Sequence, residues 1–155
     1  MTNRSKVLVG ALAAMLMIVA AGLMFVADTQ AGTESAVTVE QGSETTKLGV
    51  VWSSGDREVA LKMVFMYTHN AKKAGWFDEV QFIVWGPSEK LLAEDEELQE
   101  KVAQMMEDGI EVVACRACSD MYGVSSDLEE CGVDVKYMGR PLTNLLQSDW
   151  KIITF

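Results

Sequence analysis

Residues 110–118 read Ile-Glu-Val-Val-Ala-Cys-Arg-Ala-Cys, a β-rich run that passes directly into a pair of cysteines. Short runs rich in Val and Ile are typical of strands covered on both faces of a sheet. We therefore predict a strand over Ile110–Ala114. The same pattern predicts four more strands, at Leu48–Trp52, Val80–Trp85, Val133–Tyr137 and Ile152–Phe155.

Longer helical patterns lie between these strands. Apolar residues spaced three and four apart predict one helix over Arg57–Lys73 and another that starts at Asp95 and ends at Gly109. Asp56 and Asp95 are candidates for the residues that cap the two helix starts, because a short carboxylate accepts hydrogen bonds from free backbone N–H groups.

Two further helical regions complete the pattern. The helical region over residues 115–132 is interrupted at Gly123, and we expect it to restart at a capping box formed by Ser126 and Glu129. A last helix is predicted over Leu142–Gln147. Strands and helices that alternate through right-handed crossovers predict an α/β fold. The expected domain is a three-layer α/β/α sandwich of the Rossmann or flavodoxin-like kind, with a five-stranded parallel sheet.

The N-terminal segment differs from the rest of the chain. After two basic residues, Val7–Val26 carries no charge and is long enough for a helix to cross a bilayer, which takes about 20 residues. Residues 1–27 are therefore expected to be a signal peptide or a transmembrane anchor. Small residues before Gly32 fit a cleaved signal, whereas the length fits an anchor held in the membrane by residues 7–26. The basic residues precede the apolar run, so the remainder is predicted to lie outside the cytoplasm, in the periplasm or on the outer face of the inner membrane.

The composition of the remaining chain separates a linker from a folded domain, and the net charge of the whole chain excludes nucleic acid as an expected partner. Residues 28–46 are mostly small and polar and predict a flexible linker, so the folded domain is expected at residues 47–155. The formal net charge of -10 provides no positive field to collect phosphates, and this excludes nucleic acid as an expected partner.

The parallel sheet predicts where a ligand would bind. In such sheets the loops and helix starts gather at the carboxyl ends of the strands. Four polar side chains in those loops, Ser53, Ser54, Arg116 and Arg140, are predicted to bind substrate. The loop after the first strand has one glycine where a dinucleotide fingerprint needs three, so no cofactor is expected.

Cys115 is the nucleophile at this edge. It follows a strand directly and is expected to open a helix, where free N–H groups favour a thiolate over a thiol. A thiolate attacks the sulfur of a disulfide, polysulfide or persulfide. The structural alternative is that Cys115 is a small buried apolar residue. Cys118, one helical turn further on, has three interpretations: a disulfide partner of Cys115, a resolving thiol, or an inert packing residue.

A zinc site would require four side chains that the predicted topology separates. Cys115, Cys118, Cys131 and His69 would supply three sulfurs and one nitrogen. However, Cys131 ends a helical region and His69 lies about three turns into a helix, which places both near the opposite edge of the sheet, roughly 15–20 Å away. No metal is therefore expected.

Several stretches together resemble the DsrE/DsrF-like family of small sulfur-relay proteins, in particular its TusD-like branch. They are Val84–Ser88, Leu91–Ala93, Gly109–Gly123 and Tyr137–Gly139. Cys115 stands eight residues before Gly123, the spacing between the family's sulfur-accepting cysteine and a following Gly-Val, and Val124 matches that valine. The resemblance covers Lys47–Phe155.

The resemblance implies a five-stranded α/β/α fold, a persulfide on Cys115, and assembly into homotrimers or homohexamers. Its implied partners are sulfur donor and acceptor proteins or polysulfide. Cys118 departs from the TusD-like branch, which has alanine there, and the leader departs from the cytoplasmic location of the family's relays.

Three functional hypotheses follow. The first is a sulfur carrier or sulfurtransferase-like protein that accepts sulfane sulfur on Cys115. Whether it counts as an enzyme depends on the definition, because a carrier reloaded by partners transforms no free substrate. The second is a thiol-disulfide redox protein in which Cys115 and Cys118 cycle as a disulfide. The third is a non-catalytic oligomeric module that binds a small ligand at the strand ends.

Overall fold

Five strands and the helices between them occupy residues 45–155, the part of the chain that the computed structural model describes. The strands are β1 (Lys47–Trp52), β2 (Glu79–Val84), β3 (Glu111–Cys115), β4 (Asp134–Lys136) and β5 (Lys151–Thr154). The helical segments are α1 (Arg57–Val59), η1 (Ala60–Val64), α2 (Phe65–Lys73), α3 (Pro87–Glu94), α4 (Glu96–Glu107), α5 (Arg116–Tyr122), α6 (Ser125–Glu130) and α7 (Gly139–Leu146).

The predicted leader over residues 1–27 and nearly all of the predicted linker over residues 28–46 lie outside the described residues. Within residues 45–155, none of the helices combines the length and the apolar character that crossing a bilayer requires.

The sheet is parallel throughout, with the strand order β4-β3-β2-β1-β5. All five predicted strands are confirmed, each with ends within two residues of those expected. The three central strands are buried along almost their whole length, which explains their continuous apolar runs.

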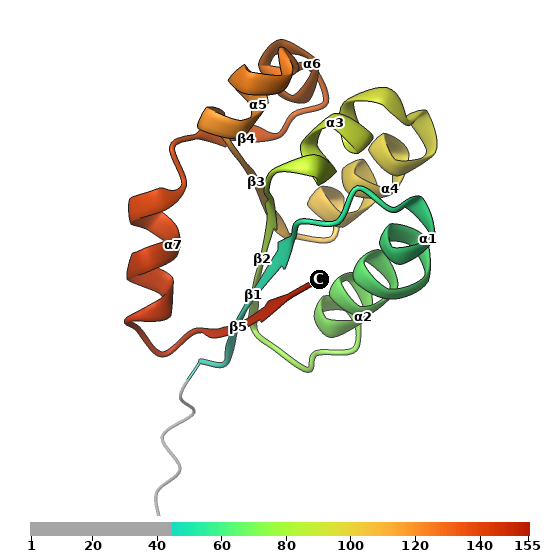
Figure 1. Ribbon diagram of the computed structural model, residues 1–155. Helices are drawn as coiled ribbons and strands as arrows, with labels where there is room; N and C mark the ends of the chain where they lie inside the picture. The colour runs from blue at the N-terminus through green and yellow to red at the C-terminus, as the bar shows by residue number, and fades with distance from the viewer. Residues whose placement is uncertain (1–44) are drawn as a thin grey trace, which may run out of the picture. The chain divides into compact units, whose positions relative to one another are not determined.

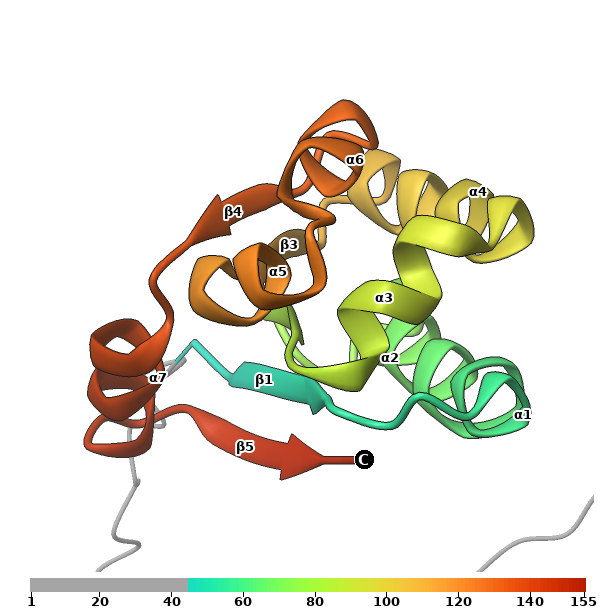
Figure 2. The same cartoon turned by 45° about the horizontal axis from the view of Figure 1, so that its top comes forward.

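Helices cover both faces of the sheet, as predicted, but unevenly. Figure 1 shows α7 on one side of the sheet and α1 to α4 on the other; Figure 2 shows α7 again apart from them. The chain steps outward in one direction from β1 to β4 and then returns to place β5 beside β1. Because crossovers are right-handed, reversing the direction of travel moves the crossing helix to the opposite face.

Side chains alternate between two apolar clusters, one on each face. The larger cluster contains three stacked or edge-on aromatic rings, Trp52, Phe65 and Phe82, with centroids 5.1–5.9 Å apart. The smaller cluster, on the α7 face, contains the following buried residues: Val51, Ile83, Val113, Cys115 and Met138. Cys115 belongs to it because it stands two positions after Val113 on the same strand.

The helix starts test the capping predictions. Asp56 accepts hydrogen bonds from two backbone N–H groups, and Asp95 accepts one from Leu98, so both predicted caps are confirmed. The capping box at Ser126 is wrong. Helix α6 begins two residues earlier than that cap requires, at Ser125, and Val124 at its cap position makes no side-chain hydrogen bond.

Candidate functional site

Cys115 is the last residue of β3 and the residue immediately before α5. Its backbone is extended, and only 4% of its surface is exposed. The predicted position at the strand end is therefore confirmed, but the thiol sits within the α7-face cluster rather than in an open loop. Helix α5 ends at Gly123, where the sequence predicted the interruption, and its seven residues provide only a small dipole field.

Cys118 lies one turn into α5, half-buried and packed against the same cluster. Both thiols are free, and their sulfurs lie within 4.8 Å of each other. Burial raises the pKa of the Cys118 thiol to about 11, and the neighbouring Cys115 adds to the rise. Cys118 is therefore a protonated thiol at neutral pH.

Glu89 lies beside the two cysteines. The sequence did not predict it as a site residue. Its side chain is fully buried, and a carboxylate oxygen lies within 4.8 Å of both cysteine sulfurs. Oε1 accepts hydrogen bonds from the backbone N–H groups of Cys115 at 3.1 Å and Gly86 at 3.3 Å, whereas Oε2 has no partner. Burial raises the pKa of Glu89 to about 7, against the effect of these two bonds. We call Glu89, Cys115 and Cys118 the thiol–carboxyl cluster.

The position of Glu89 depends on the start of α3, a helix that the sequence analysis did not predict. Pro87 opens the helix, and Glu89 reaches back to the N–H of Gly86. The hydroxyl of Ser88 donates to the carbonyl of Trp52 at 2.6 Å, which ties this turn to the end of β1. The signal in the sequence was Pro87 followed by Glu89 and two leucines, one half of a capping box at a helix start.

Gly86 is expected to be hard to replace. Its φ of +73° and ψ of -131° define a conformation that L side chains rarely adopt, and a Cβ built there meets no atom within 4 Å. Backbone strain alone should therefore lower the free energy of unfolding of Gly86→Ala by about 1–3 kcal/mol. Chemical denaturation measures this loss. Gly139→Ala, which is equally free of clashes and has no positive φ, serves as the control and should unfold like wild type.

The two arginines predicted to bind substrate are placed differently. The guanidinium of Arg116 pairs with Glu129 and donates to the carbonyl of Val135 at 2.9 Å. The pairing with Glu129 raises the pKa of Arg116, and this charge is thus already compensated. Arg140 is exposed in the first turn of α7. Their role in substrate binding stays a prediction.

Ser53 and Ser54 follow β1, and β2 separates that strand from β3. At about 4.8 Å per strand spacing, they stand about 10 Å from the end of β3. The hydroxyl of Ser53 donates to the carbonyl of Phe155, and that of Ser54 accepts from the N–H of Asp56. These bonds hold the loop; a substrate contact by either serine also stays a prediction.

The four candidate zinc ligands named above do not form one cluster. His69 is hydrogen-bonded to Asp108, and Cys131 follows the end of α6. Within residues 45–155, the thiol–carboxyl cluster is the one group of three side chains close enough to share an ion.

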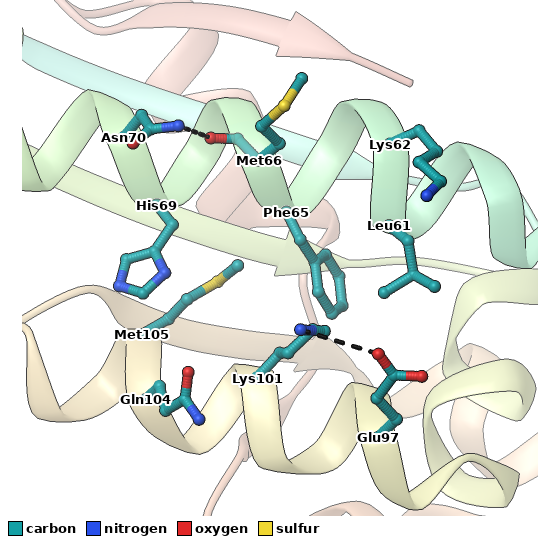
Figure 3. A pocket seen from close by; sticks show the side chains of 10 residues that line it. All are labelled: Leu61, Lys62, Phe65, Met66, His69, Asn70, Glu97, Lys101, Gln104 and Met105. Atoms are coloured by element: carbon teal, nitrogen blue, oxygen red, sulfur yellow. Dashed lines mark hydrogen bonds and ion pairs between the residues drawn. The ribbon is translucent and has the colours of Figure 1, made fainter.

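A surface groove of about 350 Å³ lies elsewhere, between α2 and α4. Figure 3 shows Phe65 and Met105 at its floor, with Lys101 and Glu97 paired at one side. Its lining includes no cysteine. The reactive groups therefore do not coincide with this groove.

Comparison with known proteins identifies relatives of the whole domain. The model of the DsrE/DsrF-like family matches residues 68–155. BT1422, a conserved protein of unknown function from Bacteroides thetaiotaomicron, is 36% identical in sequence and superposes with a TM-score of 0.68. That match covers 70% of this chain and 94% of BT1422.

Two more distant structures share the fold. The ychN protein from E. coli is 15% identical with a TM-score of 0.57, and MTH1491 from Methanobacterium thermoautotrophicum is 18% identical with a TM-score of 0.60. Each match covers 72% of this chain and 100% of the other. No protein with a curated description matches the chain.

Proposed function

Because this chain belongs to the DsrE/DsrF-like family, whose members are generally related to sulfur relay, we propose that it carries sulfane sulfur as a persulfide on Cys115. The single observation behind the proposal is the position of Cys115 at a strand end, beside a second thiol and a titratable carboxyl group. A nucleophilic sulfur with a proton acceptor close by is what attack on a donor sulfur requires.

The burial of Cys115 also supports carriage rather than rapid turnover. With 4% of its surface exposed, the sulfur that it binds is shielded by an apolar cluster from water and from unrelated thiols. A partner must then approach the site closely to deliver or remove the sulfur. A relay protein needs this selectivity.

Intact mass spectrometry tests the proposal. The purified chain is incubated with polysulfide, separated from small molecules and weighed. We expect the mass of one added sulfur atom, removed again by a reducing thiol. A wild-type protein that gains no sulfur over a range of donor concentrations contradicts the proposed function.

A second candidate function is thiol-disulfide exchange by Cys115 and Cys118. The observation in its favour is that their sulfurs already lie within 4.8 Å, so a small side-chain movement brings them toward the bonding distance of about 2 Å. Mild oxidation followed by mass spectrometry distinguishes the candidates. A redox pair loses two hydrogens and gains no sulfur.

We also propose that the domain assembles into homotrimers or homohexamers, as the family resemblance implies. Four large side chains near the sheet's β3–β4 side and on α7 leave much apolar surface exposed: Met121, Tyr122, Tyr137 and Leu146. Contact between copies would bury this surface. Sedimentation velocity measures the expected trimer or hexamer, and a monomer at all concentrations contradicts it.

The place of action proposed is outside the cytoplasm, anchored or exported. Its support is the uncharged run Val7–Val26 that follows two basic residues. Donor and acceptor would then be partners in that compartment. Fractionation of cells and determination of the N-terminus in each fraction test both the location and the fate of the leader.

A further inference from the structure

Glu89 occupies a position that structural roles explain only in part. One oxygen satisfies two backbone N–H groups, which accounts for Oε1. The other oxygen, Oε2, is one of three buried side-chain polar atoms in residues 45–155 that have no hydrogen-bond partner. A buried carboxyl group with a free oxygen costs free energy unless it gains a proton or does chemistry.

The surroundings of the Glu89 carboxyl group are unusual for a carboxylate. The titratable groups that face Glu89 from β3 and α5 are Cys115, Cys118 and Asp120. Asp120 is acidic and disfavours a second negative charge, and the neighbouring cation, Arg116, is held by Glu129. On its own helix, Lys90 pairs with Glu94 at the surface.

We propose that Glu89 is the proton carrier of the thiol–carboxyl cluster, taking the proton of the attacking thiol and returning it to the departing sulfur. This inference rests on the proposed function and adds a residue to it. The geometry supports it because one carboxyl oxygen lies within 4.8 Å of both sulfurs, a separation that a proton crosses directly after a small movement or through one water.

The sulfur-loading step balances without an oxidant. The Glu89 carboxylate takes the proton from Cys115 as Sγ attacks the outer sulfur of a donor persulfide, R–S–SH. A bond forms between Sγ and that outer sulfur, and the donor S–S bond breaks. Its electron pair leaves on R–S⁻, which takes the proton from Glu89. The products are Cys115–S–SH and R–SH, with no net change in oxidation state.

A proton carrier is needed here because the site offers no cation. Burial keeps Cys118 protonated well above neutral pH. The neighbouring cation, Arg116, pairs with Glu129 and does not compensate a charge on Cys115 or Cys118. Glu89, whose pKa lies near 7, exchanges protons readily at neutral pH. It is thus matched to the operating pH, as an efficient acid or base should be.

The test is the pH dependence of thiol reactivity in Glu89→Gln. Glutamine keeps an oxygen for the two backbone N–H groups but cannot carry the proton. The rate of sulfur loading from a small-molecule persulfide is measured from pH 5.5 to 8.5 by intact mass. We expect the ratio of wild-type to variant rates to rise through pH 7, from near one to on the order of 10². The titration of the donor persulfide changes both rates equally at each pH, so it cancels in the ratio of wild-type to variant rates.

Two controls make the result decisive. Glu94→Gln, the same change at the exposed end of the same helix, should follow wild type at every pH. Glu89→Asp, which restores a carboxyl group, should recover part of the rise. A ratio that does not vary with pH overturns the proposal, because a purely structural defect slows the reaction equally at all pH values.

Alkylation by iodoacetamide separates this inference from the proposed function. It needs only a reactive thiol and no sulfur donor, and the Glu89 dependence should appear in it as well. If wild type gains no sulfur but its alkylation rate still depends on Glu89 through pH 7, the sulfur-carrier function fails and the proton carrier stands. Alkylation profiles that are identical in wild type and Glu89→Gln overturn the proton carrier.

Discussion

Replacing Cys115 with alanine is expected to abolish the addition of sulfur to the protein. Only Cys115 combines the end of β3 with a place in the thiol–carboxyl cluster. Alanine is the suitable replacement because the side chain packs among apolar residues, where a serine hydroxyl would lack a partner. Intact mass after incubation with polysulfide measures the loss, which should be complete.

Cys131→Ala is the matched control for this experiment. Cys131 is also a free, partly buried thiol whose pKa burial raises, but it follows α6, outside the thiol–carboxyl cluster. This variant should gain one sulfur as wild type does. Undiminished sulfur addition to Cys115→Ala, or its loss in Cys131→Ala, contradicts the assignment of Cys115 as the acceptor.

The fate of the loaded sulfur then depends on Cys118. If its thiolate formed easily, it would attack Cys115–S–SH, close the disulfide and expel the sulfur as sulfide. Burial holds the pKa of Cys118 at about 11, so this internal reaction is slow at neutral pH. The same burial that makes Cys118 a poor nucleophile thus favours a carrier over a redox switch, although both need the same two cysteines.

The strands were predictable because their residues are buried on both faces. A short run rich in Val and Ile, such as Val112–Val113, is typical of a central strand, and the predicted end of β3 located Cys115 correctly. The uneven distribution of helices between the two faces of the sheet was harder to predict from the sequence. It depends on where the chain reverses its direction across the sheet, and no local pattern of residues encodes that reversal.

Glu89 shows why the rest of the site was missed. In the sequence it is one glutamate among many near an acidic run, and such residues are almost always exposed. Its burial results from the packing of α3 against the end of β3, a contact between segments 26 residues apart. Arg116 is the opposite case. It stands next to Cys115 in sequence, yet its charge is directed to Glu129.

Burial of Glu89 should also be visible in the stability of the protein. The carboxyl has a pKa of about 7 in the folded chain, against its ordinary value of 4.5 in the unfolded one. The folded state therefore binds this proton more tightly. The stability associated with it is fully present below pH 4.5 and is lost as the pH rises through 7. The loss amounts to about 3 kcal/mol.

Glu89→Gln should remove this dependence. At pH 5 both side chains are neutral, and the variant should be equal to wild type or about 1 kcal/mol less stable, because one amide N–H group lacks a partner. At pH 8 the buried charge of Glu89 destabilises only wild type. The free energy of unfolding of the variant should therefore rise by about 3 kcal/mol relative to that of wild type between the two pH values. Denaturant unfolding at the two pH values measures both differences, with Glu94→Gln as the control.

This stability measurement also identifies the group that titrates. The thiol of Cys118 releases its proton only far above pH 8, so a change between pH 5 and 8 that disappears in Glu89→Gln belongs to Glu89. A stability difference between variant and wild type that is the same at both pH values would show that Glu89 does not titrate in this range. The proton carrier would then lose its physical basis, whatever the loading rates show.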